Sequence, residues 1–124
     1  MTCFFFASCD TGCVEVKLEN DAKLYQGSRA GIYLTLSDLI NGKPSYHSSG
    51  DNYIWYNSEI NAWMFGSIDD IGSYYGGIAA YDNFGGLTDE KNVWRYWNGD
   101  EWKTAGTNDV TIECISGTSK ILYV

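Results

Sequence analysis

Apolar and polar residues alternate with period two in several short stretches of the chain. Residues 14–18 read Val-Glu-Val-Lys-Leu, and residues 110–114 read Val-Thr-Ile-Glu-Cys. This alternation is typical of a β-strand that buries one face and exposes the other. Further strands are predicted at residues 31–36, 52–57, 62–65, 76–81, 93–97, 101–103 and 120–124. Residues 36–40 are expected to form a short helical turn with Ser37 as its cap.

Turn-forming residues separate these stretches. Asn41-Gly42 and Asn98-Gly99 are each the strongest short-range signal for a two-residue type I′ hairpin, because both residues of such a turn need a positive φ. The polar residues 58–61 connect two aromatic stretches in the same way. Eight or nine short strands at this spacing predict an all-β fold, an antiparallel sandwich or a barrel-like domain spanning residues 1–124 as one unit.

Composition and charge narrow the range of partners. The chain has 124 residues, of which 16% are aromatic and fourteen are glycine, and its formal net charge is −8. Nucleic acid is not expected as a partner, because binding to phosphates depends on Lys and Arg. Membrane insertion is not expected either, because no stretch approaches the ~18 apolar residues of a membrane helix. The first seven residues lack the basic flank of a signal peptide, so a secreted protein would carry its signal outside this chain.

Four cysteines occupy positions that favour disulfides over zinc. Structural zinc sites use closely paired cysteines or histidines, and the spacings here do not form such pairs. If all four pair within the chain, one bridge joins the N-terminal group to the C-terminal cysteine, and the pairing otherwise stays open. Disulfides indicate an extracellular or cell-surface location. The four residues are Cys3, Cys9, Cys13 and Cys114.

Candidate catalytic groups are few. His47 is the single histidine, and the sequence has neither a nucleophile elbow nor a phosphate-binding glycine motif. Asp69-Asp70 could serve as one half of a glycosidase pair, but sixteen acidic residues make chance neighbours common. Asp82-Asn83 with residues 89–90 offers oxygen ligands for calcium without matching the EF-hand spacing. We therefore expect a protein that is not an enzyme and that uses no metal or cofactor.

Tryptophan is the most informative residue type. Five tryptophans exceed what one small core buries with ease, because the side chain is large and its N–H needs a partner. Core packing is one interpretation; the other is that at least two of them lie on the surface and stack on sugar rings. The five candidates for such ligand binding are Trp55, Trp63, Trp94, Trp97 and Trp102.

The chain ends suggest a different function. Segments 3–9 and 119–124 are apolar where chain ends are usually polar, and a donated strand can complete the sheet of a neighbouring subunit. Alternatively, both ends are ordinary strands of the same domain. The residues expected to take part in assembly are Phe4, Phe5, Phe6, Ile121, Leu122, Tyr123 and Val124.

Residues 31–115 also resemble a small β-module that recurs in secreted and surface proteins of aquatic invertebrates and microbial eukaryotes. The residues that support the resemblance are residues 41–46 (Asn-Gly-Lys-Pro-Ser-Tyr), 53–56 (Tyr-Ile-Trp-Tyr), 71–73 and 94–99, with Trp63, Gly66 and Trp102. The resemblance implies an extracellular β-domain and no catalytic residue. From the sequence we expect a structural and interaction module that self-assembles into an oligomer or fibril; the alternative is a carbohydrate-binding module that uses the tryptophan hairpins.

Overall fold

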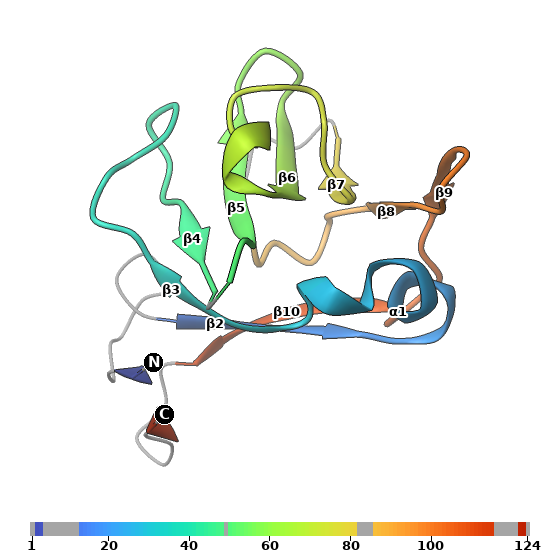
Figure 1. The fold of residues 1–124 in the computed structure, drawn as a ribbon, viewed down its shortest axis with the longest axis horizontal. Coiled ribbons are helices and arrows are strands. Elements are labelled where there is room, and N and C mark those ends of the chain that lie inside the picture. Colours follow the sequence, from blue (N-terminus) through green and yellow to red (C-terminus); the bar gives the residue numbers. More distant parts are fainter. Residues whose placement is uncertain (1, 4–12, 49, 82–85, 116–121, 124) are drawn as a thin grey trace.

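The computed structural model describes residues 2–3, 13–48, 50–81, 86–115 and 122–123. These residues form eleven strands, one α-helix and two 3-10 turns (Figure 1). The elements are β1 (Thr2–Cys3), β2 (Cys13–Leu18), α1 (Asn20–Gln26), η1 (Gly27–Arg29), β3 (Gly31–Thr35), β4 (Tyr46–His47), β5 (Tyr53–Asn57), β6 (Ala62–Gly66), η2 (Ile68–Asp70), β7 (Ile78–Ala80), β8 (Trp94–Trp97), β9 (Trp102–Thr104), β10 (Val110–Ile115) and β11 (Leu122–Tyr123).

Nine of the strands form one antiparallel sheet in the order β10-β2-β3-β4-β5-β6-β7-β8-β9. Strands β2 to β9 pair in chain order, and β10 returns to pair with β2. The sheet curls into a half-barrel, so that β4 to β7 stand above β2 and β10 in Figure 1. The prediction of an all-β, barrel-like fold of eight to nine strands is therefore confirmed. Strands β1 and β11 pair with each other in a separate two-stranded ribbon.

The inner face of the curled sheet encloses the larger of two apolar clusters. Alternate residues of β2, including Val14 and Val16, face inward and are buried. Tyr33, Trp63 and Phe65 come from the strands that follow and are almost inaccessible to solvent. Lys17 lies on the other face of β2, as period-two alternation requires. There it forms ion pairs with Glu15 of β2 and Glu113 of β10.

The central strands also bury their outer face. All five residues of β6 and all three of β7 are buried, which alternation with one exposed face would not produce. A second apolar cluster lies on the outer face and consists of Trp55, Ala62, Met64 and Ala79. Partly buried side chains from the surrounding loops and from β9 pack against it, among them Ile40, Ile71 and Trp102. This second cluster explains why β5 to β7 read as nearly continuous apolar runs.

Helix α1 packs against β8 and β2. Ala22 is its buried residue and joins the inner cluster, and Tyr25 stacks on Tyr96 of β8 with ring centroids 6.1 Å apart. The helix was not predicted, because Leu24 and Tyr25 are exposed and leave no amphipathic pattern.

The prediction of a helical turn at residues 36–40 was wrong. Ile40 instead forms an isolated bridge with Lys43, and the Leu36 backbone N–H donates to Ser45 O.

The two Asn-Gly turns differ. Asn41 and Gly42 have φ values of 54° and 77°, as a type I′ turn requires, and the prediction there is confirmed. At the β8–β9 hairpin the turn lies one residue later than predicted. The Asn98 N–H donates to Glu101 O, which makes Gly99 and Asp100 the central residues. Only Gly99 has a positive φ, 102°, as expected for a turn with glycine at its first central position.

We expect Gly99→Ala to destabilise the protein by about 1–2 kcal/mol, because a Cβ is strained at this φ. Gly86→Ala is the matched control. Both glycines have open space where a Cβ would lie, and of the two Gly99 alone has a positive φ. The free energy of unfolding, measured by urea denaturation, should fall for Gly99→Ala and stay close to wild type for Gly86→Ala. Equal effects in both variants would contradict the assigned turn.

Candidate functional site

The structure divides the five tryptophans into two groups. Trp55, Trp63 and Trp94 belong to the buried clusters, with 0%, 1% and 9% of their surface exposed. Trp97 is 36% exposed, and Trp102 is partly buried. A buried indole cannot stack on a ligand without opening the core. Ligand stacking is therefore possible for Trp97 and Trp102 but not for Trp55 or Trp63. Trp94 borders a different hollow, between residues 87–94 and 105–112.

Strand alternation places the exposed tryptophans on the outer face. In β8, Trp94 and Tyr96 are buried on the inner side, whereas Arg95 and Trp97 face outward. Trp97 lies opposite Trp102 of β9, and the two rings meet edge to face with centroids 5.7 Å apart. Because side chains alternate between the faces of a strand, two of the four residues of β8 face the core and two face outward.

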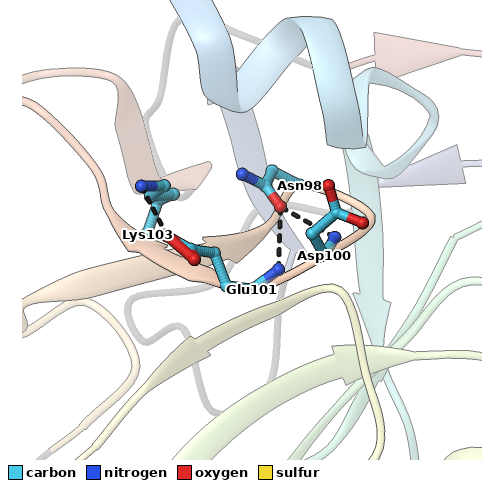
Figure 2. A network of polar contacts seen from close by, with 4 residues as sticks. All are labelled: Asn98, Asp100, Glu101 and Lys103. Carbon is cyan, nitrogen blue, oxygen red and sulfur yellow. Dashed lines mark hydrogen bonds and ion pairs between the residues drawn. The ribbon is translucent and has the colours of Figure 1, made fainter.

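The tip of the β8–β9 hairpin is held by polar contacts of Asn98 and Glu101 (Figure 2). The side-chain oxygen of Asn98 accepts hydrogen bonds from the backbone N–H groups of Asp100, at 2.8 Å, and Glu101, at 2.9 Å. Glu101 and Lys103 form an ion pair of 2.6 Å, which lowers the pKa of Glu101 and raises that of Lys103. The exposed ion pair contributes little stability, so the Asn98 contacts are the main constraint on the tip.

Next to the turn, the same hairpin is tied to helix α1 and to Gly77, the residue before β7. The Gln26 side chain donates a hydrogen bond of 2.8 Å to Trp97 O, and the Trp97 N–H donates to Gly77 O. Gln26 also accepts a hydrogen bond from Arg29 at 2.9 Å. A Cβ at Gly77 would lie 2.0 Å from Gln26 Oε1, so a larger residue there would displace the Gln26 side chain. The backbone of Trp97 is consequently fixed from both sides.

Two tyrosines reach the same face from the loop that follows η2. Tyr74 and Tyr75 are 56% and 75% exposed. Ser73 anchors the loop, since its Oγ donates to Asp70 O and accepts from the Tyr75 N–H. The Tyr74 hydroxyl donates to the Glu59 carboxylate, and this hydrogen bond raises the pKa of Tyr74. A loop held in this way can present exposed rings in a defined position.

These side chains together form what we call the aromatic surface, which consists of Tyr74, Tyr75, Tyr81, Trp97 and Trp102. Trp102 lies at its centre and borders two hollows. One, of about 540 Å³, is lined by Tyr81, Arg95 and Glu59 among others. The other, of about 480 Å³, is lined by Tyr74, Tyr75 and Trp97 with Arg29 and Asp70.

Charged groups of both signs border each hollow. The Arg95 guanidinium lies over the Tyr81 ring, 5.6 Å from its centroid, and forms no ion pair with any carboxylate of the described residues. Burial raises the pKa of Tyr81, and the nearby Arg95 offsets part of that increase. Arg29 is held by Gln26 and by Asn52, at 3.3 Å. The aromatic surface therefore combines apolar ring faces with donors and acceptors, the composition expected for binding a polar ligand that has apolar patches.

The other predicted site residues are only partly described. Phe4, Phe5, Phe6, Ile121 and Val124 lie outside the described residues, as does Cys9. Of the predicted assembly residues, Leu122 and Tyr123 are described, and they pair with Cys3 and Thr2 of the same chain. Self-assembly through the chain ends stays a prediction.

The described residues contain no group of three or more His, Cys, Asp or Glu side chains arranged to hold a metal ion. Asp82 and Asn83, considered above as calcium ligands, lie outside the described part of the chain. His47 stacks on Tyr53 at 4.3 Å, and its Nε2 lies 2.8 Å from Gly50 O.

Comparison with known proteins identifies no relative. No protein-family model matches the chain, and neither characterised proteins nor solved structures yield a significant match. Within the described residues, no helix has both the length and the apolar character needed to cross a membrane.

The two groups of tryptophans should differ in their effect on stability. Trp63→Ala is expected to cost about 3–5 kcal/mol, because it leaves a cavity in the inner cluster. Trp97→Ala should cost well under about 2 kcal/mol, because its ring is already partly in solvent. Chemical denaturation of both variants measures the difference, with circular dichroism as a check on the fold. A large loss of stability in Trp97→Ala would show that its ring belongs to the core.

Proposed function

We propose that this protein is a non-catalytic, extracellular binding module that recognises carbohydrate through the aromatic surface. The observation that supports this best is the outward-facing pair Trp97 and Trp102, with exposed Tyr74 and Tyr75 beside it. Sugar rings offer apolar C–H faces that pack on aromatic rings, and their hydroxyl groups need the donors and acceptors that border both hollows. Clustered exposed aromatic side chains are uncommon on a protein surface without a partner.

The rigidity of the site supports binding. Asn98 fixes the hairpin tip, Gln26 fixes the Trp97 backbone and Ser73 fixes the tyrosine loop. Side chains that are already held in place lose less conformational entropy when a ligand binds. Tyrosine and tryptophan add to this advantage, because each has only two side-chain torsions to restrict.

Glycan binding can be tested by a glycan-array screen followed by calorimetry on the glycans that bind. Trp97→Ala and Tyr75→Ala should each weaken binding by about tenfold, because each removes a stacking ring. Tyr25→Ala is the matched control, since Tyr25 is also an exposed tyrosine but lies outside the aromatic surface. Binding that resists both substitutions, or an array without any bound glycan, would refute the proposed function.

We also propose that the four cysteines form two disulfides, as expected for an extracellular protein. Cys13 lies opposite Ile115, and Cys114 lies opposite Val14 on the neighbouring strand. Adjacent residues of a strand point to opposite faces, so the side chains of Cys13 and Cys114 lie on different faces of the sheet. A bridge between them is incompatible with disulfide geometry. Each would then pair with Cys3 or Cys9.

Mass spectrometry tests this pairing. The intact mass should rise by four hydrogens on reduction, because four cysteines in two bridges take up one hydrogen each. Peptide mapping without reduction should link Cys13 and Cys114 to different partners in the N-terminal segment. A peptide that joins Cys13 directly to Cys114 would contradict the strand register. Four free thiols would contradict the extracellular assignment.

A further inference from the structure

We propose that the aromatic surface takes a soluble, neutral glycan chain whose successive sugar rings are rotated against one another, and does not take the flat face of a crystalline polysaccharide. This inference rests on the proposed carbohydrate-binding function and specifies its ligand. It follows from three features of the site: the angles between the rings, the two hollows on either side of Trp102, and the balance of charge.

The rings of the aromatic surface are not coplanar. Trp102 meets Trp97 at an interplanar angle of 68° and meets Tyr81 at 87°. A crystalline polysaccharide presents one flat array of sugar rings and can stack only on aromatic rings that share a plane. A single chain with a twist between residues can turn a different sugar face toward each of these rings. The angles therefore favour a twisted, soluble chain.

The two hollows indicate a ligand longer than one sugar. Trp102 lines both, with Tyr81 and Arg95 on one side and Tyr75 and Trp97 on the other. A chain that crosses Trp102 can occupy both hollows at once, and each additional sugar adds contacts without a second loss of translational freedom. Affinity should consequently increase with chain length until both hollows are filled.

Charge favours a neutral ligand. Each hollow is lined by one arginine and one carboxylate, Arg95 with Glu59 and Arg29 with Asp70. The two sites are balanced locally, whereas the whole chain has a net charge of −8. An acidic polysaccharide would meet long-range repulsion without a local excess of positive charge to offset it. Binding of the neutral ligand should change little with salt.

The experiment uses the full chain and three soluble series: α-1,4-glucose, β-1,4-glucose and β-1,4-N-acetylglucosamine oligosaccharides, from the monosaccharide to about six units. We expect at least one series to bind, with affinity rising about tenfold or more between one and about four units, as added contacts predict. Crystalline cellulose and crystalline chitin should not deplete the protein from solution, and heparin should bind more weakly than the best neutral series.

Substitutions on opposite sides of Trp102 test the span. Tyr75→Ala and Tyr81→Ala should each weaken binding of the longest oligosaccharide by about tenfold, with Tyr25→Ala unchanged. Because Tyr81 packs against the outer cluster, Arg95→Gln provides a second variant in the same hollow that removes no side chain of that cluster. A monosaccharide that binds as tightly as the longest oligosaccharide, depletion by crystalline cellulose or chitin, or preference for heparin would overturn the inference. Any of these would leave the proposed function standing, whereas failure of every glycan, acidic ones included, would overturn both.

Discussion

Strands β5 to β7 bury both faces, and much of the structure follows from that constraint. Their inner residues pack into the half-barrel, and their outer residues form a second cluster around Trp55 and Met64. A strand buried on both sides needs cover on the outer face as well. Loops supply this cover through Ile40 and Ile71, and the β8–β9 hairpin supplies it through Trp102. Side chains from these loops and from β9, including the aromatic ring of Trp102, therefore lie across the outer face of the sheet.

The aromatic surface lies where this cover ends. Trp102 packs against the outer cluster and also lines both hollows, so its ring belongs to the core and to the surface at once. Trp97 and Tyr75 continue the apolar surface outward into solvent. Their exposed area is unfavourable in the free protein, because apolar surface in water has a cost of about 25 cal/mol per Å². Under the proposed function, a ligand that covers these rings removes this cost.

Sequence patterns predicted the strands well and the sites only in part. Alternation located β2 and β10 because each has one buried face, and Asn41-Gly42 located its turn because both φ values are positive. Helix α1 escaped prediction because its contacts, such as the stacking of Tyr25 on Tyr96, come from residues distant in sequence. The nearly continuous apolar runs of β5 to β7 are a signal of burial on both faces, but the loops that cover the outer cluster are set by contacts between residues distant in sequence. For the tryptophans, alternation across residues 94–97 already predicts that Trp94 and Trp97 lie on opposite faces of the strand. The sequence does not show which face of β8 packs against the core.

The aromatic surface consequently depends on strand register more than on any single contact. A slip of one residue in β8 would turn Arg95 and Trp97 toward the core and expose Trp94 and Tyr96, because side chains alternate between faces. Such a slip would bury an arginine among apolar side chains, and an unpaired buried charge is strongly unfavourable. Gly99 and Asn98 fix the turn that sets this register, and Gln26 holds the Trp97 backbone from the helix. The same contacts that align β8 with β9 therefore decide which aromatic rings stabilise the fold and which remain available to a ligand.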